Sequence, residues 1–394
     1  MIGFSGERRE FGRRTLLRGA VGLAAVGGTA GVLDLARTAT ADRTNRTGQL
    51  RIGYLPITDA APLLVAHGSG LYPPEIVDSA KPVLFRSWAS LAEAFVSRRV
   101  DVVHLLMPMA VQLRYGLGSS VRILGWNHTN GSALTVAPHI RDLGELAGRQ
   151  IAIPFWWSIH NIALQQLLRA HGLRPVVREA PSRSSGTVGL VVMGPSDMIP
   201  ALANGSIAGF TVADPFNAAA ELRGVGRIHR FLGDMWRDHA CCALLVHEDL
   251  IERDPVAVQA LTNSVVGAQL QISADRAAAA TLLSDRYLPQ PKPAITTALT
   301  YPGRDAGTVH PEWQPHQIGY QPFPFPGFTT ALVEAMHDTV VDGDRRFLSR
   351  IDPATVHADL VDDRFVRTSL TRMAGTEAFG LPADLTRIEE VDFS

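Results

Sequence analysis

The stretch IAIPFWWSIHNIALQQLLRAHGL, residues 151–173, joins a strand pattern to a helix pattern without a long connection. It opens on an apolar run typical of a buried strand, and its second half spaces leucines at helical intervals until Gly172 ends the pattern. A strand that leads directly into a helix is the repeating unit of α/β proteins. The turn between them carries Trp156, Trp157 and His160, where small polar residues are more usual. The stretch therefore predicts an α/β fold and draws attention to this turn.

The same alternation of strand and helix patterns runs through most of the chain. One series predicts strands at 50–57, 82–87, 100–107 and 121–127, a second at 133–138, 150–155, 188–194 and 206–214, and a later strand follows at 241–247. Continuous Val, Ile and Leu runs favour parallel sheets that are covered on both faces. After Asp249 the pattern becomes helical, and residues 301–328 are typical of an ordered loop rich in Pro, Gly and aromatic side chains.

Two such series predict two α/β lobes with a ligand cleft between them. We expect lobe 1 to be discontinuous, built from residues 42–131 and 241–394 with a helical C-terminal extension, and lobe 2 to span residues 132–240. A chain of 394 residues, 46% of them hydrophobic, is long enough for both lobes. Its formal net charge of −1 gives no electrostatic reason to expect nucleic acid or an anionic membrane surface as a partner.

Residues 1–41 have the three parts of an export signal. Arginines that include the pair Arg13 and Arg14 precede an apolar run over residues 19–33, and a small-x-small cleavage site follows at 39–41. The arginine pair resembles the twin-arginine consensus, and an ordinary signal peptide is the alternative. We expect the mature chain to begin near Asp42 and to lie in the periplasm or cell-envelope space. Because no cysteine is near that point, we expect no lipid anchor there.

The cysteines and histidines give no sign of a metal, a cofactor or catalysis. The two cysteines, Cys241 and Cys242, are adjacent, so a disulfide between them would be strained. On a strand their side chains would face opposite ways, and we interpret them as separate buried thiols. The histidines lack metal-ligand spacing, and the common nucleotide, hydrolase and zinc motifs are missing. We therefore expect no metal site, no cofactor and no enzyme.

The turns after the predicted strands carry the candidate binding residues. Helix N-termini there would point N–H groups into a cleft and could hold a small anion. His160 follows one strand and Trp88 another, and imidazole and indole groups can donate to a planar oxyanion. We interpret Asp59 and Asp197 as helix caps, whereas Asp214 is equally suited to capping and to ligand contact.

Three ordered segments resemble the nitrate- and bicarbonate-binding branch of the nitrate/bicarbonate/sulfonate-binding proteins of ABC importers. They are GYLPITDAAPLLVAHGSGLY at 53–72, IPFWWSIHNIALQQLLRAHGL at 153–173 and MGPSDMIPALANGSIAGFTVADPFNAAA at 193–220. Together they cover most of residues 50–247, and the final third of the chain matches only loosely. The family's EPW segment is Asp-Pro-Phe here, and neither lysine, Lys81 or Lys292, lies in a cleft motif, although nitrate-binding members use a lysine there.

The resemblance implies a type II periplasmic-binding-protein fold and an exported receptor. Such a receptor captures a small oxyanion-like solute, such as nitrate, bicarbonate or a sulfonate, and delivers it to a membrane permease and its ATPase. The family's site residues correspond most directly to Trp88 and His160. Further ligand-binding candidates lie in the neighbouring turns: Thr58, Asn130, Ser132, Asp214 and Phe216.

Two other functions stay open at this stage. An enzyme on the same scaffold would resemble the thiamine-pyrimidine synthases, which need a lysine for pyridoxal phosphate and a cysteine-rich motif. Only the pair Cys241 and Cys242 points that way. A ligand sensor that signals to a membrane partner would show the same site residues as a transport receptor.

Overall fold

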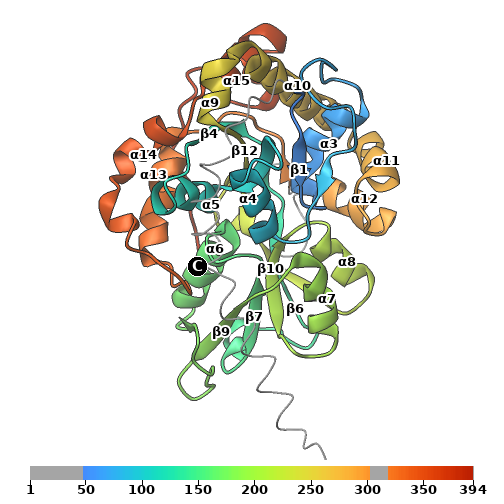
Figure 1. Cartoon of the computed structure of the whole chain (residues 1–394). Helices are drawn as coiled ribbons and strands as arrows, with labels where there is room; N and C mark the ends of the chain where they lie inside the picture. Colours follow the sequence, from blue (N-terminus) through green and yellow to red (C-terminus); the bar gives the residue numbers. More distant parts are fainter. Residues whose placement is uncertain (1–47, 302–317, 394) are drawn as a thin grey trace, which may run out of the picture. The chain divides into compact units, whose positions relative to one another are not determined.

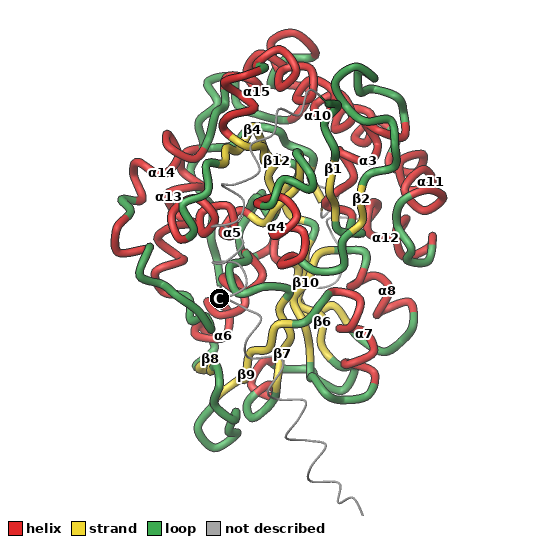
Figure 2. The backbone as a smooth tube through the Cα atoms, in the orientation of Figure 1, coloured by secondary structure: helices red, strands yellow, loops and turns green. Residues whose placement is uncertain are grey.

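The computed structural model describes residues 48–301 and 318–393, so the export signal predicted for residues 1–41 lies outside the described residues. The described part contains two large β-sheets with helices between their strands (Figure 1). In Figure 2 the strands stand out in yellow against the red helices. The predicted α/β class is thus confirmed. The first sheet has the order β2-β1-β3-β12-β4. Its strands are β1 (Ile52–Tyr54), β2 (Val83–Leu84), β3 (Val102–Leu106), β4 (Val121–Trp126) and β12 (Cys242–His247).

The second sheet has the order β11-β6-β10-β7-β9-β8. Its strands are β6 (Ser132–Val136), β7 (Gln150–Ile153), β8 (Arg174–Val176), β9 (Thr187–Val192), β10 (Gly209–Ala213) and β11 (Arg227–Phe231). The strands β5 (Thr129–Asn130) and β13 (Ile318–Gly319) form a separate, short antiparallel pair. The edge strands β8 and β11 were missing from the sequence-based prediction.

Both sheets are mixed, and the expectation of parallel sheets is wrong at two strands. In the first sheet, β12 runs antiparallel to β3 and β4, with Cys242 opposite Leu106. In the second sheet, β6 runs antiparallel to β10, with Ser132 opposite Ala213. The physical reason is connectivity. Each of these strands begins where the chain has just left the other sheet, so its first residue pairs with the last residue of a neighbouring strand.

The helices that follow the strands in the first two thirds of the chain match the sequence pattern closely. They are α3 (Ala61–Gly68), α4 (Trp88–Val96), α5 (Met107–Val111), α6 (Ile159–Ala170), α7 (Pro195–Ala203) and α8 (Phe216–Leu222). Local signals fix their starts. Ser87 accepts a hydrogen bond from the backbone N–H of Ser90 at the start of α4, and Ser158 accepts one from Asn161 at the start of α6.

The C-terminal portion is helical, as predicted. It contains α9 (Glu248–Arg253), α10 (Pro255–Ala274), α11 (Arg276–Arg286), α12 (Lys292–Thr300), α13 (Pro326–Asp338), α14 (Pro353–Leu360) and α15 (Arg364–Met373). Helix α10 packs against α3 and α15, which places it over the first sheet. Within the described ranges, every helix is too short or too polar to cross a lipid bilayer.

One continuous apolar core joins the two sheets. It includes Leu105 and Ile123 of the first sheet together with Ile151 and Phe210 of the second. Trp157, from the turn that opened the sequence analysis, is buried in this core and meets Phe347 edge-to-face at 5.5 Å. Trp157 therefore packs the second sheet's helix α6 against the C-terminal portion of the chain.

Candidate functional site

The ends of strands from both sheets meet at one buried junction. Strands β1, β3 and β4 end beside the start of β12 in the first sheet, and β7 and β10 end beside the start of β6 in the second. The chain passes between the sheets there twice, at residues 127–131 and at residues 232–241. Thr58, after β1, donates both its backbone N–H and its hydroxyl to the carbonyl oxygen of Asp214, after β10, at 2.8 and 2.9 Å. These bonds hold the strand-end loops of the two sheets in direct contact.

Asp59 lies at the centre of this junction. It belongs to a 3-10 turn (Thr58–Ala60) after β1, and its carboxylate is fully buried. Its Oδ2 lies 3.0 Å from His128 Nε2 in an ion pair that lacks hydrogen-bond geometry. The turn has no side-chain cap, so the interpretation of Asp59 as a helix cap is wrong.

Both cysteines face the same cluster. Cys242 Sγ lies 3.5 Å from Asp59 Oδ2 and 3.8 Å from Cys241 Sγ, and both cysteines are free and buried. The expectation that their side chains point opposite ways is wrong. Cys241 lies just before β12, where the alternation of an extended strand does not yet apply. Asp59, His128, Cys241 and Cys242 thus lie together, and one donor atom from each is within 4.8 Å of the other three.

Four buried histidines surround the Asp59 carboxylate. Burial opposes charge on His128, but the neighbouring Asp59 carboxylate overrides it and raises the pKa of His128 to about 10. Burial lowers the pKa of His104 and of His160 to about 3, and that of His239 to about 4. Burial also opposes ionisation of Asp59, yet His128 holds its pKa below the usual range. At neutral pH the cluster therefore contains one ion pair and three neutral imidazoles.

His160 and Trp88 both reach this junction. Ser132, at the start of β6, places its Oγ 2.9 Å from His160 Nε2, which joins two of the predicted site residues directly. Trp88, at the start of α4, packs edge-on against His104 with ring centroids 5.4 Å apart. The Asp59 carboxylate is near enough to raise the pKa of both His104 and His160 against the effect of burial. The indole of Trp88 and the imidazole of His160 thus lie on the two sides of one polar cluster.

Asp214 and Phe216 follow β10 on the other side of the junction. Asp214 Oδ1 accepts a hydrogen bond from the backbone N–H of Ala218 at 3.2 Å, while Oδ2 has no partner. The carboxylate therefore caps the start of α8 with one oxygen and leaves the other free. Burial raises the pKa of Asp214 to about 7. Phe216 is part of the apolar core, and only 5% of its surface is exposed.

Asn130 lies in the first crossover between the sheets. Its backbone is left-handed, with φ of 56°, and its side-chain amide donates to Asp238 at 3.2 Å. Its Oδ1 is buried without a partner. The residue therefore braces the crossover, and its free oxygen is available to a ligand.

The structure brings all seven predicted site residues to the junction, each buried. Sequence reasoning missed four residues that occupy its centre or border it: Asp59, His104, His128 and His239. His104 lies inside a strand pattern, and the HTNGS segment at 128–132 has no metal or catalytic signature. Only the TDAAP and CC segments could have drawn attention to Asp59 and the cysteines.

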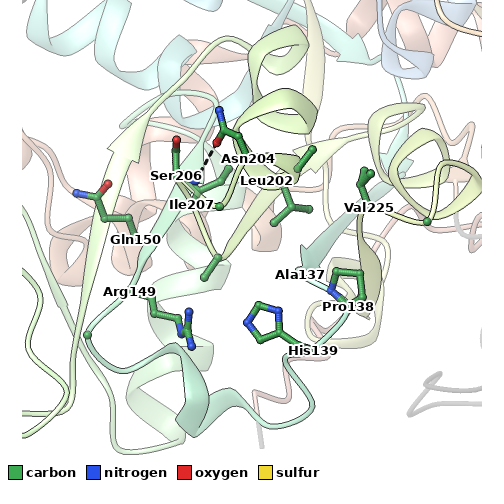
Figure 3. A pocket seen from close by; sticks show the side chains of 15 residues that line it. Ala137, Pro138, His139, Arg149, Gln150, Leu202, Asn204, Ser206, Ile207 and Val225 are labelled. Atoms are coloured by element: carbon green, nitrogen blue, oxygen red, sulfur yellow. Dashed lines mark hydrogen bonds between the residues drawn. The ribbon is translucent and has the colours of Figure 1, made fainter.

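A separate pocket lies at the opposite edge of the second sheet. Figure 3 shows His139, Arg149 and Gln150 around it, together with Asn204 and Ser206. The pocket lies where β6 ends and where β7 and β10 begin. The junction lies at the opposite ends of these three strands, so the pocket is remote from it. None of the predicted site residues lines it, and it offers an open surface hollow instead of converging buried groups.

Comparisons with known proteins agree with this architecture. The nitrate/nitrite-binding protein NrtA of Nostoc is 25% identical over 244 residues, which cover 57% of this chain and 53% of that protein. The taurine-binding periplasmic protein of Escherichia coli is 28% identical over 213 residues, covering 54% of this chain and 63% of that protein. The chain spans about half the length of the NrtA relatives that it matches.

A solved structure extends the likeness to the fold. The periplasmic nitrate-binding protein NrtA of Synechocystis superposes with a TM-score of 0.73 at 18% identity, covering 88% of this chain and 94% of that one. At this identity the likeness shows the fold alone, which is that of the periplasmic binding proteins. The NMT1-like family matches residues 43–284, a segment that includes both sheets and the whole junction. This protein is a member of the NMT1-like family.

Proposed function

We propose that the protein is an exported solute-binding protein of an ABC importer. It captures a small oxyanion-like solute, such as nitrate, bicarbonate or a sulfonate, and delivers it to a membrane permease and its ATPase. The observation that carries this proposal is the junction itself. Turns from two sheets converge there on a buried group of polar side chains, several of which lack partners. Ligand sites of α/β proteins lie at the carboxyl ends of strands in this way.

The relatives support a transport role. Two are described as nitrate/nitrite-binding and taurine-binding proteins, and others as ATP-binding proteins of nitrate and bicarbonate import. Periplasmic location is stated for the taurine-binding relative and for the Synechocystis structure. On these grounds we place this chain outside the cytoplasm, with a permease–ATPase complex as its partner, and assign it binding without catalysis.

The two sheets supply the moving parts of the proposed receptor. We propose that residues 48–131 and 241–393 of the described chain form lobe 1, and residues 132–240 lobe 2. Among residues 48–301 and 318–393, the chain then connects the two sheets at 127–131 and 232–241. Two or three crossing segments allow a hinge motion that closes both lobes on a solute. The bonds from Thr58 to the carbonyl of Asp214 would form on closure.

The junction offers hydrogen-bond donors suited to an oxyanion. His104 Nε2 accepts a bond from the backbone N–H of Leu55, so its Nδ1 carries the proton, and that proton has no acceptor. Both lysines of the chain are exposed and outside the junction, so recognition would depend on neutral donors.

A thermal-shift screen tests this proposal. The purified protein is heated with nitrate, nitrite, bicarbonate, taurine or an alkanesulfonate, and a solute at 100 times its Kd should stabilise it by about 2.7 kcal/mol. We expect His160→Ala and Trp88→Ala to abolish the shift, because both remove groups that face the solute.

Matched controls come from the same chain. His247 is a buried histidine stacked on Phe95 at 4.3 Å, away from the junction, and Trp157 is a buried tryptophan against Phe347. His247→Ala and Trp157→Phe should keep the ligand shift even if they lower the melting temperature. A full shift in both His160→Ala and Trp88→Ala, with folding intact by circular dichroism, would remove these residues from the site.

A further inference from the structure

We propose that Asp59, His128, Cys241 and Cys242 form a closed binding site for one divalent transition metal ion of the Zn²⁺ type. The site goes beyond the proposed function, because the ion would be a fixed part of the protein and not its solute. The four side chains are fully buried, and one donor atom from each lies within 4.8 Å of the other three. Sequence spacing does not indicate this site, since its ligands come from three distant segments.

The distances between donor atoms suit a tetrahedral ion. With Zn–S bonds of about 2.3 Å, two sulfur ligands of a tetrahedral ion lie about 3.8 Å apart. The sulfurs of Cys241 and Cys242 are 3.8 Å apart. A sulfur and an oxygen ligand lie about 3.5 Å apart in the same geometry, which is the separation of Cys242 Sγ and Asp59 Oδ2, 3.5 Å. The contact of Asp59 Oδ2 with His128 Nε2, at 3.0 Å, is slightly closer than tetrahedral coordination requires.

Unpartnered polar atoms give an independent reason to expect a ligand here. Asp59 Oδ1 and His128 Nδ1 are buried and have no hydrogen-bond partner. The contact of His128 Nε2 with Asp59 Oδ2 is an ion pair without hydrogen-bond geometry. Buried polar groups in folded proteins are nearly always satisfied, so this concentration needs an explanation. His239 adds to it. Its Nδ1 donates to the carbonyl of Trp236 at 2.8 Å, which leaves the Nε2 lone pair buried and unused beside Asp59 and His128. A cation held by the Asp59 carboxylate and one ring nitrogen of His128 would satisfy part of this unmet polar capacity.

The donor types narrow the choice of ion. Two thiolates, one imidazole and one carboxylate suit Zn²⁺, whereas Mg²⁺ and Ca²⁺ prefer sites made of oxygen atoms. When the ion binds, each metal–sulfur bond forms as its thiol releases a proton to solvent, and the His128 ring does the same as its nitrogen coordinates. Four protein ligands without an open position are typical of a structural zinc site, not a catalytic one.

The position of the ligands gives the ion a role in the architecture. Asp59 follows β1, His128 lies in the first crossover between the sheets, and Cys241 and Cys242 end the second crossover. One ion would therefore tie both crossovers to the first sheet. Gln269 of α10 already braces the first crossover through bonds to the carbonyls of Trp126 and Asn127, each at 2.9 Å. The metal would fix the base of the hinge on which the proposed closure depends.

The test uses the whole chain produced in medium supplemented with Zn²⁺ or with Co²⁺ and purified without chelators. We expect about one metal ion per chain, as for a four-ligand structural site. The Co²⁺ form should show sulfur-to-cobalt charge-transfer absorption and the visible bands of a tetrahedral ion. The double variant Cys241→Ser/Cys242→Ser should lose the charge-transfer absorption and retain less than about a tenth of the metal. His247→Asn, a buried histidine outside the cluster, is the matched control and should bind as the wild type does.

Two results would overturn the proposal. One is a wild-type chain that leaves supplemented medium without stoichiometric metal, or a Co²⁺ form without the charge-transfer absorption. This readout needs no variant, so a folding defect cannot obscure it. The other is an unchanged metal content in the cysteine double variant. Solute binding is measured on the same preparations by thermal shift, so failure of the metal site and failure of the receptor function appear as separate results.

Discussion

Three arginines near the C-terminus each lie over an aromatic ring, and their side chains differ in burial. Arg387 lies 4.6 Å from the centroid of the Phe325 ring, Arg367 lies 4.6 Å from that of Phe323, and Arg364 lies 4.7 Å from that of Phe365. Each also forms an ion pair with a carboxylate close in sequence. The exposed fractions of the three side chains are 16%, 48% and 63%, respectively. Replacement of each by alanine therefore removes one ring contact and one ion pair at increasing exposure, and at Arg387 it removes further ring contacts as well.

The buried member of the series should dominate. Arg387 also lies 4.9 Å from the ring centroid of Trp126, and it bonds Glu389 at 2.8 and 3.0 Å. Cation–π contacts contribute about 2 kcal/mol when desolvated and about 0.5–1 kcal/mol at exposed sites. Its removal also leaves the carboxylate of Glu389, 9% exposed, with the indole N–H of Trp236 but without its cation. We expect Arg387→Ala to lower the free energy of unfolding by about 3–4 kcal/mol.

The two more exposed arginines, Arg367 and Arg364, should contribute less to stability than Arg387. Arg367→Ala should cost about 1 kcal/mol and Arg364→Ala about 0.5 kcal/mol, because water screens both their ring contacts and their ion pairs. Urea unfolding monitored by fluorescence and by circular dichroism measures all three, with equal m-values as the check on two-state behaviour. Equal losses for the three variants, or a loss below about 1 kcal/mol for Arg387→Ala, would refute the argument that burial decides the strength of these contacts.

Two further predictions concern acid stability and close packing. Hydrogen bonds from Arg114, at 2.6 and 2.7 Å, outweigh burial and with Tyr115 lower the pKa of Asp359 to about 2. A lowered pKa stabilises the fold above the unfolded-state value near 3.8, and this stabilisation is lost as the pH falls toward 2. Asp359→Asn should therefore lower the free energy of unfolding by about 1 kcal/mol at pH 7, a value reduced for solvent screening, and by almost nothing at pH 2. A difference in urea midpoints that does not depend on pH would contradict this. Gly209→Ala should destabilise the fold by about 1–3 kcal/mol, because the new Cβ would lie 2.8 Å from the carbonyl oxygen of Thr135 in the second sheet. Gly343→Ala is the control, because a Cβ there meets nothing within 4 Å. Equal melting temperatures for the two variants would argue against this packing.

Local signals in the sequence were enough to place the main elements. Helix α7 spans Pro195–Ala203, since Pro195 suits a first helical position and Asn204 and Gly205 end the pattern. Helix α6 begins after the cap Ser158. The apolar runs of β3 and β7 identified central strands, because a strand that is covered on both faces is largely apolar.

The edge strands β8 and β11 of the second sheet and the strand directions were not accessible in this way. Arg174–Val176 and Arg227–Phe231 contain charged or half-exposed residues, because an edge strand has neighbours on one side only. The antiparallel directions of β6 and β12 follow from the two crossovers between the sheets, and such long-range connectivity leaves no periodic signal. The domain limits and the ligand contacts at Trp88 and His160 remain predictions that the proposed binding experiments address.

The sequence alone determined the fold class, the positions of the central strands and helices, and the family resemblance that led to Trp88 and His160. Each depends on residues near one another in the chain, where hydrophobic period, caps and turn residues act locally. Only the tertiary structure decided that Asp59, His128, Cys241 and Cys242 meet. Their contact depends on the register of β12 against β3 and on the two crossovers, and a shift of one residue in that register would turn Cys242 away from Asp59.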